Sequence, residues 1–576
     1  MKPSRKRRFF LCLPLYMMEY LSIGDVACQN KEDQRVVVAE ALDQFVVAQQ
    51  VYRNVVLDVV GSGALSQQVD RAYQEIINNE RSNPSNGYAE TSGAYFANED
   101  VIGGSRVEAS LRDVNRSGDR VSANWTQMRG KSKLSPGIGY IESPALYSEL
   151  LSLGMSSPDL RLNYTAPMGT LETCRGIKRT MDARIDPGRD FFSTEGVFVV
   201  EGATEGIDIA LESIAVLKPG SRVVCLGFSY YTANFVAQNK GLRPDRLMRS
   251  PIDPGAKTQF LPTPQEIRTS LPQDTSTIVL TMPGNPDGGV YSDQELIEIM
   301  KLAREKGLIV LFDALFENMY FDRAMNFQSP VLRAAAKVGA LDRVVIIDSL
   351  SKTMNLPGAR LGMLATTNSE ITRTLQSRII ARRCNPPLIY EPLYQFEGLA
   401  RQMAARQRGD LSVTPTTLAN EAFVNGAYPF TKVQFLRMYS EWRFWQEQAL
   451  KYYEDNVRLV KTLLSNDIDA GSSDEAAFNT LVRLGQVPLG TNHIDFLAKL
   501  MFTTATYTQV GPCFGLSQRV WDTNLGVWSR ITYACSRRDL IDGVARLTGF
   551  AQLYGDRAFG DINRFPVLQI SYDNQI

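Results

Sequence analysis

The feature that most constrains the fold is an alternation of apolar runs with amphipathic segments between about residues 195 and 365. Five runs are nearly continuously apolar, as strands covered on both faces of a sheet should be. They are 197–200, 223–226, 277–281, 308–312 and 343–347. The clearest intervening segment begins with the capping box Ser292–Glu295, repeats apolar residues on one helical face and ends at Gly307. Strands that alternate with helices predict an α/β domain with a mainly parallel sheet.

The 576 residues, 44% of them hydrophobic, are too many for one ordinary core and predict at least two domains. Helix-like returns of apolar residues occupy 30–80, whereas 83–133 is rich in Ser, Gly, Asn and Arg and is typical of a connecting segment. A long helical run follows at 431–465, and the tail mixes short strands and helices. The predicted units are a partly helical N-terminal extension at 1–130, a segment joining the small domain at 131–165, a large domain at 166–378, a helical insert at 379–455 and a C-terminal α+β small domain at 456–576.

Composition argues against several classes of function. Lys+Arg and Asp+Glu both number 62, so no net field favours nucleic acid or an anionic membrane, and no segment is apolar for long enough to span a bilayer. The seven scattered cysteines form no CxxC pair, which favours a reducing compartment such as the cytoplasm. The single histidine, His493, makes a histidine triad or a multi-histidine metal site hard to build. We therefore expect no metal, and we interpret His493 as a structural or exposed residue.

The strongest chemical signal is the string from Asp348 to Gly362, which contains a lysine just past a predicted buried strand. Hydroxyl residues flank Lys352, and Arg360 follows eight positions later. Burial and nearby cations would lower the pKa of the lysine and give a neutral nucleophile, while Ser349, Ser351 and Arg360 can hold phosphate oxygens. This pattern suits an aldehyde cofactor with a phosphate tail. Alone, it fits a surface loop with a solvated lysine equally well.

Other polar strings follow the predicted strands. Gly202–Gly206 opens a helix, and a helix N-terminus offers unpaired N–H groups to a phosphate. Phe228–Phe235 carries an aromatic pair, Pro283–Gly289 is a turn around Asn285, and Asp313 closes the run 308–312. Each string alone is weak evidence of a functional site, because such turns and an aspartate cap occur in many α/β proteins. Their order along the chain is the informative property.

Taken together, these strings resemble the fold-type-I pyridoxal 5'-phosphate (PLP) enzymes, specifically the class I/II aminotransferases and the related 1-aminocyclopropane-1-carboxylate synthases. The resemblance runs from about Pro136 to the C-terminal region and is interrupted near 380–450. The string Ser349–Gly362 looks much like the lysine motif of the synthases, including its Leu-Pro-Gly. The resemblance implies an aminotransferase-like fold and PLP as the cofactor. Lys352 would hold PLP as an aldimine and then act as the base that removes the substrate's α-proton.

The resemblance also implies which residues bind the cofactor. Ala203 and Thr204 would bind the phosphate together with the serines and the arginine of the lysine string. Tyr231 would stack on the pyridine ring, and Asn285 would donate to its phenolic oxygen. Asp313 would face the ring nitrogen and keep it protonated, so that the ring can withdraw electrons from the substrate.

The substrate site follows from the same resemblance. Arg530 matches the arginine that grips the α-carboxylate of an amino acid, assisted by Asn285. Gly139 matches a loop that closes over that carboxylate. Tyr164 matches a tyrosine that reaches the cofactor of the neighbouring subunit, which implies a homodimer with shared active sites.

One departure leaves the reaction open. The family usually has a tyrosine three residues after the ring-nitrogen aspartate, and this chain has Phe316, with Tyr320 as a candidate to compensate. We therefore expect an aminotransferase acting on an α-amino acid, with a PLP-dependent lyase or cyclase as the alternative, because the fold does not choose between these outcomes. A PLP-sensing regulator is the third hypothesis. Residues 1–130 show no clear DNA-recognition helix or sustained basic face to support it.

Overall fold

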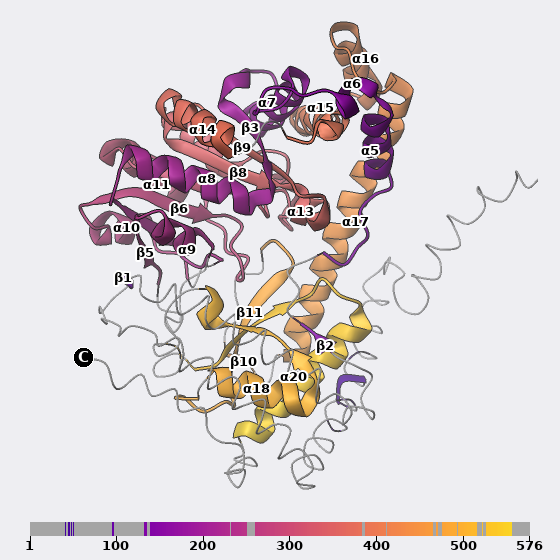
Figure 1. Cartoon of the computed structure of the whole chain (residues 1–576). Coiled ribbons are helices and arrows are strands. Elements are labelled where there is room, and N and C mark those ends of the chain that lie inside the picture. The colour runs from indigo at the N-terminus through magenta and orange to yellow at the C-terminus, as the bar shows by residue number, and fades with distance from the viewer. Residues whose placement is uncertain are drawn as a thin grey trace, which may run out of the picture.

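Figure 1 shows the computed structural model of the chain. The structure describes residues 139–230, 232–249, 260–382, 386–410, 412–464, 468–469, 475–491, 493–514, 521 and 526–555, with short pieces at 41, 44–46, 48, 50, 95–96 and 132–134. Most of the N-terminal extension at 1–130, including the helices predicted at 30–80, lies outside the described residues. No helix in the described ranges has both the length and the apolar character needed to cross a membrane.

The large domain is built on an eight-stranded sheet, as far as the described residues show, in the order β1-β5-β4-β6-β7-β8-β9-β3. Strands β5, β4, β6, β7 and β8 run parallel, whereas β9 is antiparallel to both of its neighbours and β1 is antiparallel to β5. The strands are β1 (Tyr95–Phe96), β3 (Val197–Glu201), β4 (Arg222–Leu226), β5 (Arg243–Leu247), β6 (Thr275–Thr281), β7 (Ile309–Asp313), β8 (Val344–Ser349) and β9 (Leu361–Thr366). The predicted mainly parallel sheet is confirmed.

All five predicted strands are present, with ends that differ from the prediction by at most two residues. Strand β5 was not predicted because its sequence, Arg-Pro-Asp-Arg-Leu, is mostly polar. Its charged side chains find partners inside the fold: Asp245 forms an ion pair with Arg222, and Arg246 Nη1 donates to Gly227 O at 2.8 Å. Because its polar groups are paired, this strand can be buried although its sequence contains no apolar run that would predict a strand.

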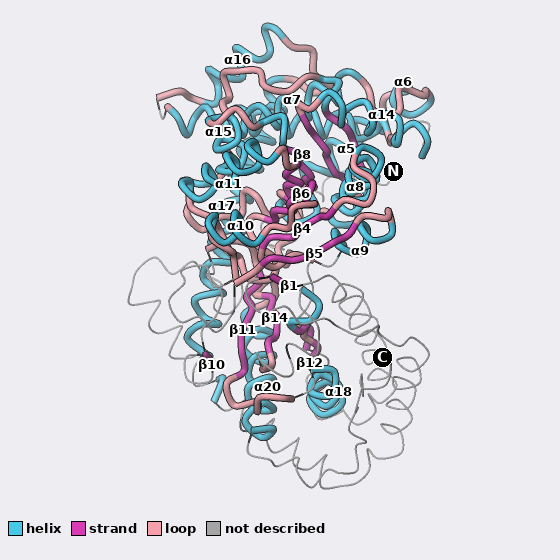
Figure 2. Tube along the Cα trace, turned by 90° about the vertical axis from the view of Figure 1, so that its left-hand side faces the viewer, coloured by secondary structure: helices cyan, strands magenta, loops and turns pink. Residues whose placement is uncertain are grey.

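Helices cover both faces of this sheet, as the nearly edge-on view in Figure 2 shows. Successive residues of β8 alternate between two apolar clusters, with Val344 and Ile346 in one and Val345 and Ile347 in the other. One face is covered by α8 (Gly202–Leu217), α9 (Thr232–Asn239) and α14 (Ser369–Arg382). The other is covered by α7 (Leu171–Ile185), α10 (Pro264–Ser270), α11 (Asp293–Lys306), α12 (Pro330–Lys337) and α15 (Glu391–Gly409).

The predicted signals at the ends of α11 are confirmed. Ser292 and Glu295 form a reciprocal capping box at its N-terminus, and Gly307 ends the helix with a left-handed φ of 66°. That conformation is strained for any residue with a Cβ, so a glycine at this position sets where the helix stops.

The helices predicted as an insert at 379–455 form, and one of them belongs to the large-domain core. Helix α15 packs along α7 at two glycines: a Cβ on Gly176 would lie 2.4 Å from Tyr394 O, and one on Gly398 would lie 2.3 Å from Gly176 O. Helices α5 (Leu146–Ser156), α6 (Pro158–Leu162) and α16 (Pro415–Asn425) lie at the same end of the molecule (Figure 1). The two glycines let the backbones of α7 and α15 approach to van der Waals contact.

The smaller domain combines an antiparallel sheet with helices, as predicted for the tail. Its strand order is β10-β11-β14-β13, with β10 (Ile468–Asp469), β11 (Asn479–Leu484), β13 (Gln509–Val510) and β14 (Trp528–Thr532). Helices α18 (His493–Thr504) and α20 (Arg537–Gly555) complete the core, and β2 (Ser132–Lys133) pairs with β12 (Thr506–Tyr507). His493 has a structural place here, fully buried, where its Nε2 accepts a hydrogen bond from Trp528 N at 3.3 Å.

One long helix, α17 (Lys432–Leu464), extends through both domains and confirms the long helical run predicted at 431–465. Its 33 residues correspond to a rod of about 50 Å. Phe435, Tyr439 and Trp442 pack in the large-domain cluster, whereas the buried apolar residues between Ala449 and Leu464 pack in the small-domain cluster. The helical spacing of its aromatic residues therefore reflects core packing.

Candidate active site

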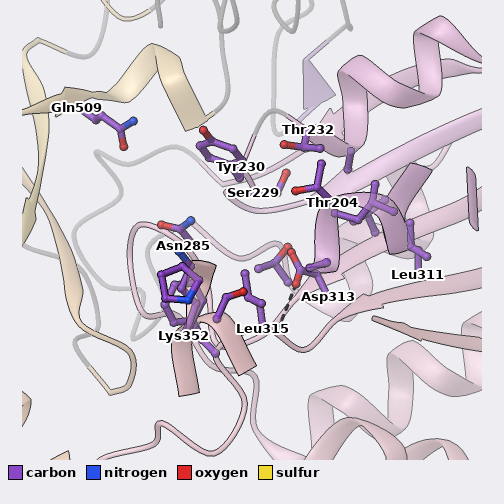
Figure 3. Close-up of a pocket in the computed structure, with 18 of the residues that line it drawn as sticks. Thr204, Ser229, Tyr230, Thr232, Asn285, Leu311, Asp313, Leu315, Lys352 and Gln509 are labelled. Carbon is purple, nitrogen blue, oxygen red and sulfur yellow. Dashed lines mark hydrogen bonds between the residues drawn. The ribbon is translucent and has the colours of Figure 1, made fainter. Parts of the chain in front are cut away.

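A cavity of about 320 Å³ opens where the carboxyl ends of the parallel strands face the small domain. Thr281 ends β6, Asp313 ends β7 and Lys352 follows β8, so three neighbouring strands deliver side chains to one place. Figure 3 shows how the side chains converge from the two domains. Eight residues predicted from the sequence line this cavity: Ala203, Thr204, Asn285, Asp313, Ser351, Lys352, Arg360 and Arg530.

Lys352 lies in α13 (Leu350–Thr353), a single turn that begins directly after β8. Ser349 caps this turn, because its Oγ accepts a hydrogen bond from Ser351 N at 3.1 Å. Burial, together with the charges of Arg530 and Arg360, lowers the pKa of the Lys352 amine to about 8, although Asp313 acts in the opposite direction. The lysine is therefore far more often neutral near pH 7 than an exposed lysine, and only the neutral amine is nucleophilic.

Asp313 presents a carboxylate to the same cavity. Burial raises its pKa to about 6, and the charge of Asp348 adds to that effect, whereas a hydrogen bond from Leu315 N and the charge of Lys352 lower it. Leu315 N donates to Asp313 Oδ1 at 3.2 Å. A half-buried carboxylate with a raised pKa gains stability from a cationic partner, so this position suits a protonated ring nitrogen.

The start of α8 brings an arginine and hydroxyl groups together at one end of the cavity. Gly202 has a left-handed φ of +78°, and a Cβ there would lie 2.7 Å from Arg360 Nη2. Arg360 Nη2 donates to Glu201 O at 2.8 Å, which holds the guanidinium over the first turn of the helix. The hydroxyls of Thr204 and Ser351 line the cavity nearby. A helix N-terminus, an arginine and hydroxyl groups together provide what a phosphate requires.

Arg530 lies on β14 at the small-domain side of the cavity. Its side chain is buried, its Nη1 donates to Asn285 Oδ1 at 3.3 Å, and its guanidinium lies 5.1 Å from the centre of the Phe514 ring. These contacts fix the plane of the guanidinium, so it can present a two-pronged donor to a carboxylate.

Phe316 also lines the cavity and makes an edge-on contact with Phe478, with ring centroids 5.3 Å apart. The family's tyrosine hydroxyl is therefore replaced by an apolar ring edge. Tyr320 does not take its place: it is fully buried, it is outside the cavity lining, and its hydroxyl has no partner among the described residues.

The remaining predicted residues do not line the cavity, or lie outside the described part of the chain. Ser349 is buried behind the cavity with its hydroxyl 2.7 Å from that of Ser351. Gly139 packs beside Asn355 and Tyr453. Tyr164 is 85% exposed and is not part of the cavity lining, and Tyr231 lies outside the described residues.

A buried ion cluster that was not predicted from the sequence links the segment after Asp313 to the segment before Lys352. Arg184 Nη1 lies 3.1 Å from Glu317 Oε2, and its Nη2 forms an ion pair with Asp348. Glu317 follows Asp313 by four residues, and Asp348 precedes Lys352 by four. The sequence signal for this cluster was Asp348, an acid near the end of an apolar strand. It could not identify Arg184, which lies 164 residues away, as its partner.

Further residues that line the cavity were also missed by sequence reasoning. They are Ser229, Tyr230, Thr232, Thr281, Leu315 and Gln509, among others. Ser229 and Tyr230 belong to the string Phe228–Phe235, which was predicted to place an aromatic ring at the cofactor. Tyr231, the residue predicted to stack, lies outside the described residues.

Comparison with known proteins identifies the family. A model of the family "Aminotransferase class I and II" matches residues 161–546. A putative aminotransferase, YugH, of Bacillus subtilis is 26% identical over 43% of this chain and 65% of its own length. Nicotianamine aminotransferase 1 of Oryza sativa subsp. japonica is 24% identical over 62% of each chain. The matches therefore span less than two thirds of the length of these curated relatives.

Solved structures share the fold. An aromatic aminotransferase from Pyrococcus horikoshii superimposes with a TM-score of 0.55 and 19% identity, covering 74% of this chain and 97% of that one. The Thermus thermophilus aspartate aminotransferase with maleate has a TM-score of 0.55 and 17% identity, covering 78% and 96%. The family model matches well over half of the sequence, and the chain therefore belongs to the aminotransferase class I and II family.

Proposed function

We propose that the protein is a PLP-dependent aminotransferase that acts on an α-amino acid, with Lys352 as the residue that binds the cofactor aldehyde. The observation that carries the proposal is the meeting of three groups in one cavity. These are a half-buried amine with a pKa near 8, a half-buried carboxylate with a raised pKa, and the arginine and hydroxyl groups gathered at the start of α8. PLP carries an aldehyde, a ring nitrogen and a phosphate, and each matches one of these groups.

Two further observations support the fit of PLP to this cavity. Thr281 Oγ1 is buried in the cavity wall with no hydrogen-bond partner among the described residues, so a bound ligand can satisfy it. The volume of about 320 Å³ lies at the lower end of the range for small-molecule sites and suits a single ring with a phosphate tail.

Each group at the site then has a distinct task. Ala203, Thr204 and Arg360 would hold the phosphate, and Asp313 would keep the ring nitrogen protonated. When bound, PLP supplies the electron sink that makes the α-proton of the substrate acidic. Arg530 would orient the substrate through its α-carboxylate, and the Nζ of Lys352 would take up and return the α-proton.

Transamination is the reaction that the relatives favour. The curated relatives described above are both named as aminotransferases. The lyase or cyclase alternative rests on the Leu-Pro-Gly at 356–358 and on Phe316 in place of the family's tyrosine. Phe316 removes one hydroxyl from the cavity wall without removing the amine, the carboxylate or the groups gathered at the start of α8.

A homodimer is part of the proposal. Leu162 and Tyr164, which end and follow α6, are 71% and 85% exposed. Aromatic side chains such as that of Tyr164 are enriched at interfaces between proteins. We place Tyr164 at the cofactor of the partner subunit, as expected from the sequence. The described cysteines are free, which agrees with a reducing compartment, and we propose the cytoplasm.

The test is covalent attachment of PLP at Lys352. The purified protein is incubated with PLP, its visible absorption is recorded, and the bound cofactor is trapped with borohydride and located by peptide mass spectrometry. We expect the label on the peptide that contains Lys352. The Lys352→Ala variant should lose both the absorption band and the label, whereas Lys306→Ala, an exposed lysine at the end of α11, should keep both.

Product analysis then separates the reactions. Amino acids are supplied with and without a 2-oxo acid acceptor. Transamination requires the acceptor for sustained turnover, whereas a lyase or cyclase does not. A protein that stays colourless with PLP, or a label at other lysines only, would refute the proposed cofactor site.

A further inference from the structure

Gln509 places a buried amide in the cavity wall opposite the cofactor residues. It lies on β13, its side chain is 7% exposed, and it lines the same cavity as Lys352. Figure 3 shows it entering from the small domain, across the cavity from Asp313 and Thr204. Its Oε1 is buried and has no hydrogen-bond partner among the described residues. A buried acceptor without a partner is costly to a fold, so its presence in a binding cavity points to a ligand.

The backbone fixes where this amide lies relative to the substrate. Gln509 and Arg530 are directly opposed residues of the antiparallel pair β13 and β14. Opposed residues project from the same face of a sheet, with Cβ atoms roughly 4.5–5.5 Å apart. A substrate held by its α-carboxylate at Arg530 therefore has the Gln509 amide beside it.

The charges of the cavity limit which side chain the amide can meet. Within the described lining, the cations are Lys352, Arg360 and Arg530. In the proposed function the first serves the aldehyde, the second the phosphate and the third the α-carboxylate. No further cation of the described lining is then available to pair with an acidic side chain, and the same three cations repel a basic one.

We propose that Gln509 is a specificity-determining residue that accepts a hydrogen bond from an uncharged polar side chain of the amino-acid substrate, a carboxamide or a hydroxyl. The inference rests on the proposed function and adds the substrate class to it. A carboxamide or hydroxyl donates to Oε1 and can also accept from the Gln509 amide nitrogen. An apolar side chain leaves the amide unsatisfied, and sites built to hydrogen-bond a substrate group reject analogues that lack it.

The experiment compares matched amino acids on the PLP-loaded protein. Glutamine and methionine have similar length, as do serine and 2-aminobutyrate, and within each pair only the first carries a donor. Apparent Kd values come from titration of the visible band, and KM and kcat are measured separately. On the wild type, the polar member of at least one pair should bind about tenfold tighter, the effect of one satisfied buried hydrogen bond.

Gln509→Met keeps the length of the side chain and removes the amide. We expect the preference for the polar member to disappear, mainly in Kd and KM, while the apolar member binds as well as before or better. Gln294→Met, at an exposed position of α11, is the control and should change neither. The absorption band and circular dichroism of each variant report that it is folded and loaded.

The outcomes distinguish this inference from the proposed function. A wild type that shows no absorption band with PLP overturns both. A wild type that binds PLP and amino acids but does not distinguish the members of either pair overturns the role of Gln509 alone. An equal loss of affinity for polar and apolar members in Gln509→Met also overturns it, because that result assigns the amide to the common α-carboxylate.

Discussion

Replacement of Arg184 tests whether its buried ion pairs stabilise the segments that carry Asp313 and Lys352. Its guanidinium forms ion pairs with Glu317, beyond Asp313, and with Asp348, before Lys352, and all three charged side chains are at least 98% buried. Arg184→Met keeps a long apolar stem but leaves two acids without their shared cation. Removal of one partner from a buried pair costs about 3–5 kcal/mol of folding free energy.

The magnitude should fall within that range, because one of the two acids can adapt. Burial already raises the pKa of Glu317, while the charge of Arg184 lowers it. Without Arg184, Glu317 can take up a proton, so its contribution to the loss is limited. Loss of Arg184 also leaves the Asp348 carboxylate without its ion-pair partner. The double variant Arg184→Met with Asp348→Asn should therefore be more stable than Arg184→Met alone, with a coupling of about 1–3 kcal/mol.

Urea unfolding followed by circular dichroism measures these differences. The matched control is Arg175→Met on the same helix, whose ion pair with Glu172 is exposed and should contribute about 0.2–1 kcal/mol. A second measurement is the pH at which PLP binding reaches half of its maximum, which should shift in Arg184→Met because the loops of Asp313 and Lys352 loosen. A loss no larger than that of Arg175→Met, with an unchanged pH midpoint, would refute the reasoning.

Three further predictions follow from single contacts. The rate of PLP capture should rise with pH through about 8, as Lys352 loses its proton. Arg530→Met should move the midpoint of this pH dependence upward, because the charge of Arg530 lowers the pKa of Lys352. Stopped-flow absorbance measures both midpoints, and a wild-type midpoint near 10 would contradict the lowering of the Lys352 pKa by burial. Gly202→Ala should weaken PLP binding in equilibrium titrations, because its Cβ would lie 2.7 Å from Arg360 Nη2 at a φ of +78°; an unchanged Kd would show that the guanidinium moves freely. Gly176→Ala should destabilise the chain by about 1–3 kcal/mol in thermal unfolding, whereas the exposed Gly188→Ala should not; equal stability would mean that α7 and α15 can separate at no cost.

Local pattern was enough to predict much of the fold. The five apolar runs became strands because burial on both faces of a parallel sheet requires continuous apolar sequence. The capping box at Ser292 and the glycine at 307 set the ends of α11 through hydrogen bonds within a few residues. The polar strand β5 escaped prediction because its stability comes from the ion pair of Asp245 with Arg222, which lies in another strand.

The candidate site likewise combines features that were predicted from the sequence with features that only the tertiary structure shows. By itself, the sequence determined that Lys352, Asp313, Asn285 and the start of α8 would follow successive strands, since each ends a run whose period can be read locally. Only the tertiary structure decided that Arg184 joins two of these loops and that Gln509 faces the cavity beside Arg530. Arg184 and Asp348 are 164 positions apart, and Gln509 belongs to a different domain from Lys352. Such contacts depend on how helices and domains pack, and no short-range pattern records that packing.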